Sequence, residues 1–117
     1  VRTSLIAAGA ALAVLAAAVV GATASAAPKA TVTVALVSDI GKFNDRSFNQ
    51  NQLAGLNKAK TNLGITALAK QSNSVSDYIP NMTTAVRQKA NLVIAAGFLL
   101  ADATATMAKK FPGDSSI

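Results

Sequence analysis

Three short apolar runs stand out along the chain, each with few polar residues. Such runs are typical of strands that are covered on both faces in a parallel sheet. The pattern therefore predicts three strands, at residues 31–37, 65–69 and 91–96.

Between and after these runs, apolar residues recur every three or four positions, which is the period of an amphipathic helix. The first predicted helix starts near Ser47, with Asp45 or Ser47 as its N-cap, and Gly64 supplies a left-handed stop. A second covers 77–90 and a third covers 100–111. The residues expected on the inward faces are Phe48, Leu56, Ala59, Leu63, Ile79, Met82, Val86, Ala90, Leu100, Ala103, Met107 and Phe111.

The order β-α-β-α-β-α has crossovers long enough for parallel pairing, so it predicts an α/β fold with an open parallel sheet in three layers. This is half of a doubly wound sheet. Residues 115–117 are expected to begin a fourth strand. A sheet of three strands leaves a long apolar edge and is marginally stable alone, so we interpret the chain as a fragment of a larger protein.

The N-terminal segment has the pattern of an export signal. Arg2 precedes an apolar run at 5–20, and the small residues at 24–26 resemble a cleavage site. We predict a signal peptide over 1–26 and a binding domain over 27–117. The alternative is an uncleaved membrane anchor, because 5–24 approaches the length needed to span a bilayer. Both predict an exported domain at the cell surface, in the periplasm or on the outer face of the plasma membrane.

The amino-acid composition excludes several kinds of functional site. The 117 residues suffice for one small domain. The chain has no Cys, His or Glu, which excludes disulfides, Cys/His metal sites, Cys or His nucleophiles and lipid attachment through Cys. The eleven Lys and Arg residues are spread along the chain and give a net charge of +6, without the basic block interleaved with aromatics that marks a nucleic-acid surface.

No catalytic motif emerges. Gly41 stands alone after the first predicted strand, so neither phosphate-binding glycine pattern is present. Asp39 and Asp45 are the best candidates for an acid/base or metal pair, but no His, Cys or Glu supports them. We therefore expect no enzyme activity, no cofactor and no metal.

The polar and aromatic segment 38–50 lies between the first strand and the first helix. Ligands of open α/β sheets bind outside the carboxyl ends of the strands. This segment is therefore predicted to form one wall of a pocket for a small molecule.

Several segments resemble the basic membrane protein (Bmp) family, the purine nucleoside receptor A-like substrate-binding components of ABC importers. The matching segments are 34–41, 44–50 with Gly55-Leu56, Asp77-Tyr78 with Asn81-Met82, and 91–103. The resemblance implies a type I periplasmic-binding-protein fold whose two lobes close on a ligand, of which this chain would cover the first part of lobe 1. It also implies a nucleoside as ligand and the permease subunits of an ABC transporter as partners. The chain departs from the family in lacking a lipobox Cys and in its length.

The family resemblance also implies how a nucleoside would be held, by aromatic stacking on the base and by carboxylates on the ribose hydroxyls. Phe43 is the candidate for stacking, although it would also serve as a plug of the lobe's own core. Core packing is the favoured role for Phe48. The predicted ligand-binding residues are Asp39, Phe43, Asn44, Asp45, Asn49, Gly97 and Asp102.

Each polar candidate has a structural alternative. Asn44 and Asn49 carry the donors and acceptors that read a base edge, or they act as cap and turn residues. Asp45 either binds the ligand or caps the helix, and Asp39 either binds the ligand or accepts bonds from loop amides. Asp102 either binds the ligand or stabilises the third helix through its dipole. Gly97 either lets the backbone approach the ligand or simply ends the third strand.

A second function is compatible with the same fold. An exported or membrane-anchored surface or signalling protein would use this domain without a role in transport. It would show no change in melting temperature or fluorescence on adding a ligand.

Overall fold

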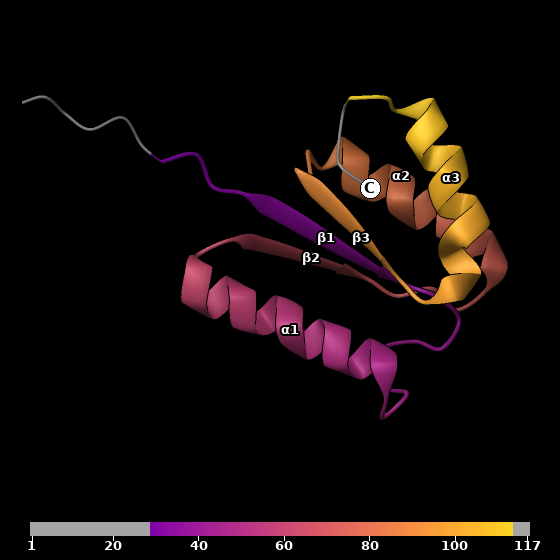
Figure 1. Cartoon of the computed structure of the whole chain (residues 1–117), viewed down its shortest axis with the longest axis horizontal. Helices are drawn as coiled ribbons and strands as arrows, with labels where there is room; N and C mark the ends of the chain where they lie inside the picture. Colours follow the sequence, from indigo (N-terminus) through magenta and orange to yellow (C-terminus); the bar gives the residue numbers. More distant parts are fainter. Residues whose placement is uncertain (1–28, 114–117) are drawn as a thin grey trace, which may run out of the picture.

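A computed structural model describes residues 29–113 of the chain. Its centre is a sheet of three parallel strands, β1 (Thr33–Ser38), β2 (Thr66–Lys70) and β3 (Leu92–Ala96), in the order β2-β1-β3 (Figure 1). The predicted α/β class and the parallel pairing are confirmed. The predicted signal peptide and the start of a fourth strand lie outside the described residues.

The register of the strands brings their carboxyl ends to one edge of the sheet. Val37 of β1 is paired with Lys70 of β2, and Ser38 is paired with Ala96 of β3. The loops that follow β1 and β3 therefore start side by side, which is the arrangement that creates ligand sites in open α/β sheets.

Helices cover both faces of the sheet, as the alternating order predicts. Helix α1 (Phe48–Leu63) lies on one face, and α2 (Tyr78–Arg87) and α3 (Ala101–Lys110) lie on the other (Figure 1). Short 3₁₀ turns at Val75–Asp77 and Phe98–Leu100 lead into α2 and α3. Gly64 ends α1 in the left-handed conformation with φ of 66°, as predicted.

The core is divided by the sheet. The larger cluster lies between the sheet and α2 and α3, where Met82, Leu100 and Met107 are fully buried. The smaller cluster lies on the α1 side, where Leu36 and Leu56 are buried. Since successive strand residues point to opposite faces, the strand β1 supplies both clusters and is buried along almost its whole length.

The predicted inward stripe of α1 is wrong at both ends. Phe48 is 56% exposed and Leu63 is 74% exposed, whereas Asn49 and Leu56 are buried. The helix makes one turn every 3.6 residues, so the burial of Asn49 turns Phe48 away from the sheet. A hydrogen bond from Asn49 to Asp39, described below, accounts for this orientation.

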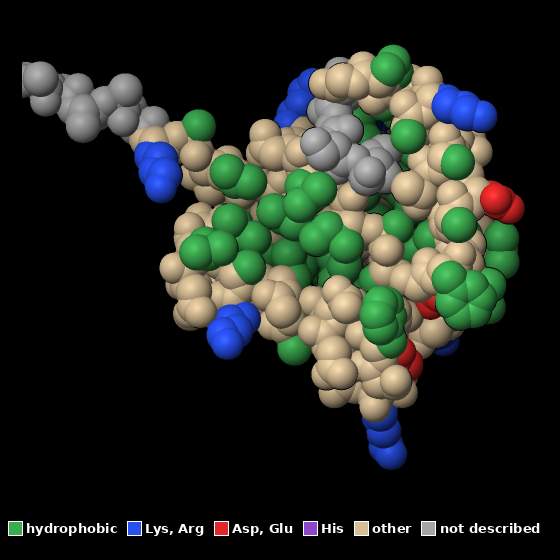
Figure 2. Space-filling model, in the orientation of Figure 1, with side chains coloured by type: hydrophobic (Ala, Val, Ile, Leu, Met, Phe, Trp, Pro, Cys, Tyr) green, Lys and Arg blue, Asp and Glu red, His purple; other side chains and the backbone are tan. Residues whose placement is uncertain are grey.

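Beside α1, the sheet face remains open to solvent. A hollow of about 830 Å³ runs along the helix and over β1 and β3. We name it the apolar groove; Leu36, Leu56, Leu63, Leu92 and Ile94 are among the residues that line it. Figure 2 shows apolar side chains gathered over this part of the face. Among residues 29–113, no helix has the length and apolar character needed to cross a membrane.

Candidate functional site

Asp39 links the end of β1 to the loop and to α1. Its backbone N–H donates to the Ala96 carbonyl of β3 at 3.0 Å. Its Oδ1 accepts hydrogen bonds from the Gly41 N–H at 2.9 Å and from Asn49 Nδ2 at 2.8 Å. Only 7% of Asp39 is exposed, so the carboxylate fixes the start of the loop and the rotation of α1 together.

Gly97, which follows β3, packs against the same carboxylate. Its φ is 112°, and a Cβ at this position would overlap the Asp39 Oδ2 atom. Both observations require glycine, because the φ is unfavourable for L residues and because no side chain fits. The residue that Gly97 packs against is thus Asp39, and a ligand contact at Gly97 stays a prediction.

Asp45 caps helix α1. Its Oδ1 accepts from the backbone N–H groups of Ser47 and Gln50 at 2.9 and 3.0 Å, and its Oδ2 accepts from the Asn49 N–H at 2.9 Å. The Asn49 N–H is the main cause that lowers the pKa of the Asp45 carboxyl below its ordinary value of 3.8, against a smaller opposing effect of desolvation. The capping alternative is therefore what the structure shows, and Ser47 makes no side-chain cap bond.

A second set of hydrogen bonds ties the loop to the far face of the sheet. The Ile40 N–H donates to Tyr78 Oη at 3.2 Å, and the Ser72 N–H donates to Ser38 Oγ at 3.1 Å. Asn81 Nδ2 donates to Ser72 Oγ at 3.0 Å. These bonds connect the end of β1 and the start of its loop to residues 72–81.

The carboxyl ends of β1 and β3 and the first turn of α1 enclose a hollow of about 580 Å³. We name it the strand-end hollow. Its lining residues are Asp39, Gly41, Asp45, Phe48, Asn49, Ala95, Gly97 and Phe98. It is smaller than the apolar groove, but it is the place where polar groups converge, as they do in small-molecule sites.

Four of the seven predicted ligand-binding residues line this hollow: Asp39, Asp45, Asn49 and Gly97. The other three do not. Phe43 is half-buried and packs against the α1-side cluster, while its N–H donates to Gln71 Oε1 at 3.3 Å. Asn44 is exposed in the loop, and Asp102 is exposed in the first turn of α3. Ligand contacts by these three residues stay predictions.

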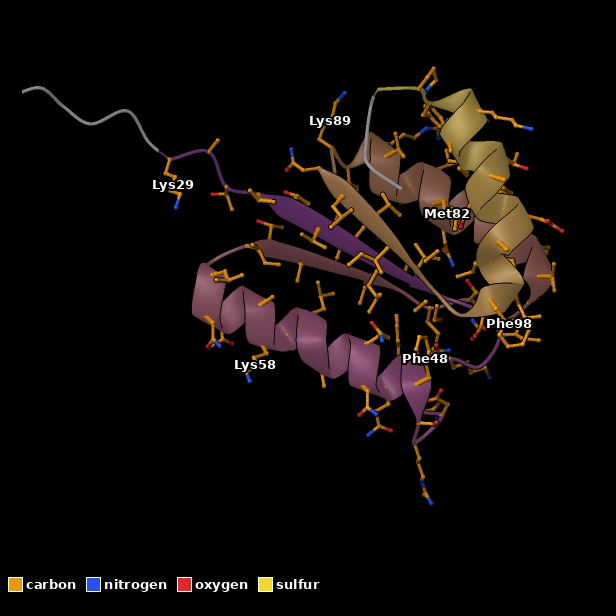
Figure 3. The ribbon with its side chains drawn as sticks, viewed as in Figure 1. Lys29, Phe48, Lys58, Met82, Lys89 and Phe98 are labelled. Carbon is orange, nitrogen blue, oxygen red and sulfur yellow. The ribbon has the colours of Figure 1, made fainter. Side chains whose placement is uncertain are left out.

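The prediction missed two aromatic residues of the hollow, Phe48 and Phe98. Both side chains lie at the same end of the sheet (Figure 3), and both are exposed, by 56% and 86%. Their positions in the sequence could have indicated this location. Phe98 follows the glycine that ends β3, and Phe48 is the first residue of the helix after the β1 loop.

Among the described residues, no group of three or more His, Cys, Asp or Glu side chains is placed to hold a metal ion. Asp39 and Asp45 both line the hollow. Asp39 Oδ1 and both carboxylate oxygens of Asp45 accept bonds from backbone and amide groups. The hollow is thus lined by carboxylate and amide groups together with two exposed aromatic rings.

Residues 32–114 match the sequence model of the family Bmp, described as ABC transporter substrate-binding protein PnrA-like. The chain belongs to this family. The match covers β1 and the loop after it, the helices α1 and α2 whose residues are hydrogen-bonded to that loop, and β3 with Gly97. Substrate-binding proteins of the family are extracytoplasmic.

Two curated relatives agree with this assignment. The ABC transporter nucleoside-binding protein BmpA of Lactococcus lactis subsp. cremoris is 41% identical over 90 residues, which are 72% of this chain and 25% of the relative. A CD4+ T-cell-stimulating antigen of Listeria monocytogenes is 40% identical over 87 residues, 68% of this chain and 24% of the relative. The chain thus spans about a quarter of the length of the curated relatives it matches.

A solved structure shows the same fold. The ABC transporter system solute-binding protein from Aeropyrum pernix K1 superposes with a TM-score of 0.62 at 24% identity, over 69% of this chain and 22% of that protein. The Bmp family and the α/β fold expected from the sequence are both confirmed.

Proposed function

We propose that this chain is the N-terminal part of the first lobe of an extracytoplasmic solute-binding protein of an ABC importer, and that the protein binds nucleosides. The observation that carries the proposal is the strand-end hollow, where carboxylate, amide and aromatic groups from three elements meet. Membership of the Bmp family and the name of the nucleoside-binding relative BmpA support it.

The lining offers a separate group for each part of a nucleoside. The carboxylate of Asp39 accepts two hydrogen bonds within the chain and that of Asp45 accepts three, which leaves further acceptor positions on both. A hydrogen bond to a charged group contributes about 1.5–3 kcal/mol. The Asn49 side chain already donates to Asp39, which leaves its carbonyl oxygen as an acceptor. The exposed Phe48 ring offers a stacking surface, and stacking of a base on an aromatic ring contributes about 1–3 kcal/mol. In this proposal Phe48 takes the role that the sequence favoured for Phe43.

The wider proposal follows the family. Residues 1–26 act as a signal peptide, and the domain works at the outer face of the cell together with permease subunits of an ABC transporter. The site binds and releases its ligand without catalysis.

Titration of the chain with inosine, guanosine, adenosine and cytidine tests the proposal, with D-ribose as the comparison ligand. Two-dimensional NMR detects weak as well as tight binding. We expect nucleosides to shift resonances of Asp39, Asn49 and Gly97. No shift with any of the four nucleosides would overturn the proposal.

A pair of variants on α1 sharpens this test. Phe48→Ala is expected to weaken nucleoside binding roughly 5- to 150-fold, the equivalent of one lost stacking contact. Leu63→Ala is the matched control, since Leu63 is also an exposed apolar residue of α1 but lies at its other end. Equal affinities of the two variants would remove Phe48 from the site.

A second function has one supporting observation, the relative named as a CD4+ T-cell-stimulating antigen. Under this alternative the chain belongs to an exported surface protein or signalling protein without a transport role. Absence of any change in melting temperature across the same nucleosides would favour it.

A further inference from the structure

At residues 38–40 the chain passes from β1 into its loop, and each of these residues is bonded to a different element. Ser38 Oγ accepts a backbone N–H of the loop after β2 at 3.1 Å. The Asp39 N–H donates to a carbonyl of β3 at 3.0 Å, and the Ile40 N–H donates to Tyr78 Oη of α2 at 3.2 Å. The position of the Asp39 carboxylate in the strand-end hollow therefore depends on groups that lie outside the hollow.

Tyr78 holds the backbone directly after Asp39. Its ring is part of the cluster between the sheet and the helices α2 and α3, and only 3% of the residue is exposed. Its hydroxyl oxygen accepts the N–H of Ile40, the residue that follows Asp39. Because a buried tyrosine hydroxyl usually requires a hydrogen-bond partner, the packing of the ring and the bond of its hydroxyl fix Ile40 together.

Asn81 is connected to the residue before Asp39 through one intermediate. Its Nδ2 donates to Ser72 Oγ at 3.0 Å. Ser72 is fully buried, and its N–H donates to Ser38 Oγ at 3.1 Å. Asn81 follows Tyr78 by three positions on α2, and residues three apart lie on the same face of a helix. One face of α2 therefore carries both groups that are bonded to the neighbours of Asp39.

We propose that Tyr78 and Asn81 are positioning residues of the binding site, which set the place of the Asp39 carboxylate and hence the affinity for the ligand without touching the ligand. The inference rests on the proposed function and adds two side chains of α2 to it. Neither residue lines the strand-end hollow. Asp39 Oδ1 also accepts from Asn49 Nδ2 at 2.8 Å, so a displacement of the carboxylate would reach Asn49 on α1 as well.

The chain without ligand provides the first test. The NMR signals of the Asn49 side-chain amide report on the Asp39 carboxylate, because the two groups are hydrogen-bonded. Tyr78→Phe removes the hydroxyl that holds Ile40 and keeps the ring in the core. It is expected to shift the Asn49 side-chain signals, although Tyr78 and Asn49 belong to helices on opposite faces of the sheet (Figure 1).

Inosine titrations of the variants provide the second test. Tyr78→Phe and Asn81→Ala are each expected to weaken inosine binding about 2- to 12-fold, the equivalent of one hydrogen bond. Val86→Ala is the control for a loss of stability alone, because Val86 is buried in the same helix and cluster but has an aliphatic side chain without hydrogen bonds. It is expected to lower the melting temperature and to leave the inosine affinity and the Asn49 signals as in the parent. Circular dichroism of all three variants verifies the fold.

The outcomes separate the positioning role from the proposed function. If Tyr78→Phe leaves the Asn49 signals in place, or if a variant binds inosine as the parent does, the positioning role of that residue is overturned and the nucleoside site stands. A loss of affinity in Val86→Ala equal to that in Tyr78→Phe would also overturn it, because lower stability would then explain both losses. If the parent binds none of the four nucleosides, the proposed function falls, and the Asn49 signals of Tyr78→Phe still decide whether Tyr78 positions Asp39.

Discussion

The strand-end hollow and the apolar groove both border helix α1, but they are built in opposite ways. The hollow meets the first turn of α1, where Asp39, Asp45 and Asn49 are joined by hydrogen bonds of 2.8–2.9 Å. The groove runs along the rest of the helix, where Leu63, Leu92 and Ile94 lie partly exposed and the lining is mostly apolar.

The two hollows therefore differ in the kind of contact that their linings offer. Directional bonds place the groups of the hollow at defined positions, which ligand recognition requires, whereas the groove offers only apolar area without directional contacts. Volume alone would select the groove, at about 830 Å³ against about 580 Å³. The polar groups select the hollow. Substitutions at the hollow should therefore be costly, and substitutions at the groove should be tolerated.

The largest effect is expected from Gly97→Ala. The new Cβ would overlap the Asp39 carboxylate at a φ of 112°, and strain of this kind together with overpacking costs roughly 3 kcal/mol or more. Urea denaturation followed by circular dichroism measures the loss.

Gly64→Ala is the control for Gly97→Ala. Gly64 also has a positive φ, of 66°, but no atom within 4 Å of an added Cβ. It should therefore cost only the backbone strain, about 1–2 kcal/mol. Equal losses in the two variants would show that the contact with Asp39 contributes nothing.

A smaller effect is expected from Asn49→Ala. The variant removes a buried donor from the Asp39 carboxylate, at a cost of about 1–3 kcal/mol in the free energy of unfolding. Asn57→Ala, at an exposed position of the same helix, should change stability by less than about 0.5 kcal/mol. If Asn49→Ala were as stable as Asn57→Ala, the orientation of α1 would not depend on this bond.

Asp45→Asn should weaken the helix cap in a way that depends on pH. The pKa of Asp45 is lowered in the folded chain, mainly by the Asn49 N–H, so its carboxylate stabilises the fold above the unfolded value of 3.8. This contribution is lost as the pH falls below 3.8 and through the lower folded pKa. We therefore expect Asp45→Asn to be less stable than the parent at neutral pH and equal to it well below pH 3.8.

Asp77→Asn provides the comparison for this pH experiment. The N–H groups of Asn73 and Ser74 lower the pKa of Asp77 in the same way, but Asp77 does not line the hollow. Both variants should show the same pH trend, and only Asp45→Asn should also alter nucleoside-induced shifts. A stability difference for Asp45→Asn that persists at low pH would contradict the capping role.

The smallest effect, and one of opposite sign, is expected at the groove. Gly55 lies within α1, lines the groove and has no atom within 4 Å of an added Cβ. Gly55→Ala should therefore stabilise the chain by about 0.5–1 kcal/mol through helix propensity alone. Thermal denaturation measures the change, and a loss of stability would mean that the groove is narrower than the structure shows.

The sequence by itself determined the architecture. Apolar runs and helical periods placed the three strands and three helices, and the alternation of these elements required parallel pairing. The stop at Gly64 and the buried face of α3 with Leu100 and Met107 were also predicted correctly, because local conformation and a strong apolar stripe decide them.

Only the tertiary structure decided which side chains line the strand-end hollow. The apolar stripe of α1 is weak, so a hydrogen bond from Asn49 to Asp39 sets the rotation of the helix and turns Phe48 outward. Gly97, distant in sequence, meets the same carboxylate and presents Phe98. No local pattern encodes a contact between residues from three separate elements, and this is why the sequence predicted a loop after the first strand but did not place Phe48 and Phe98 beside it.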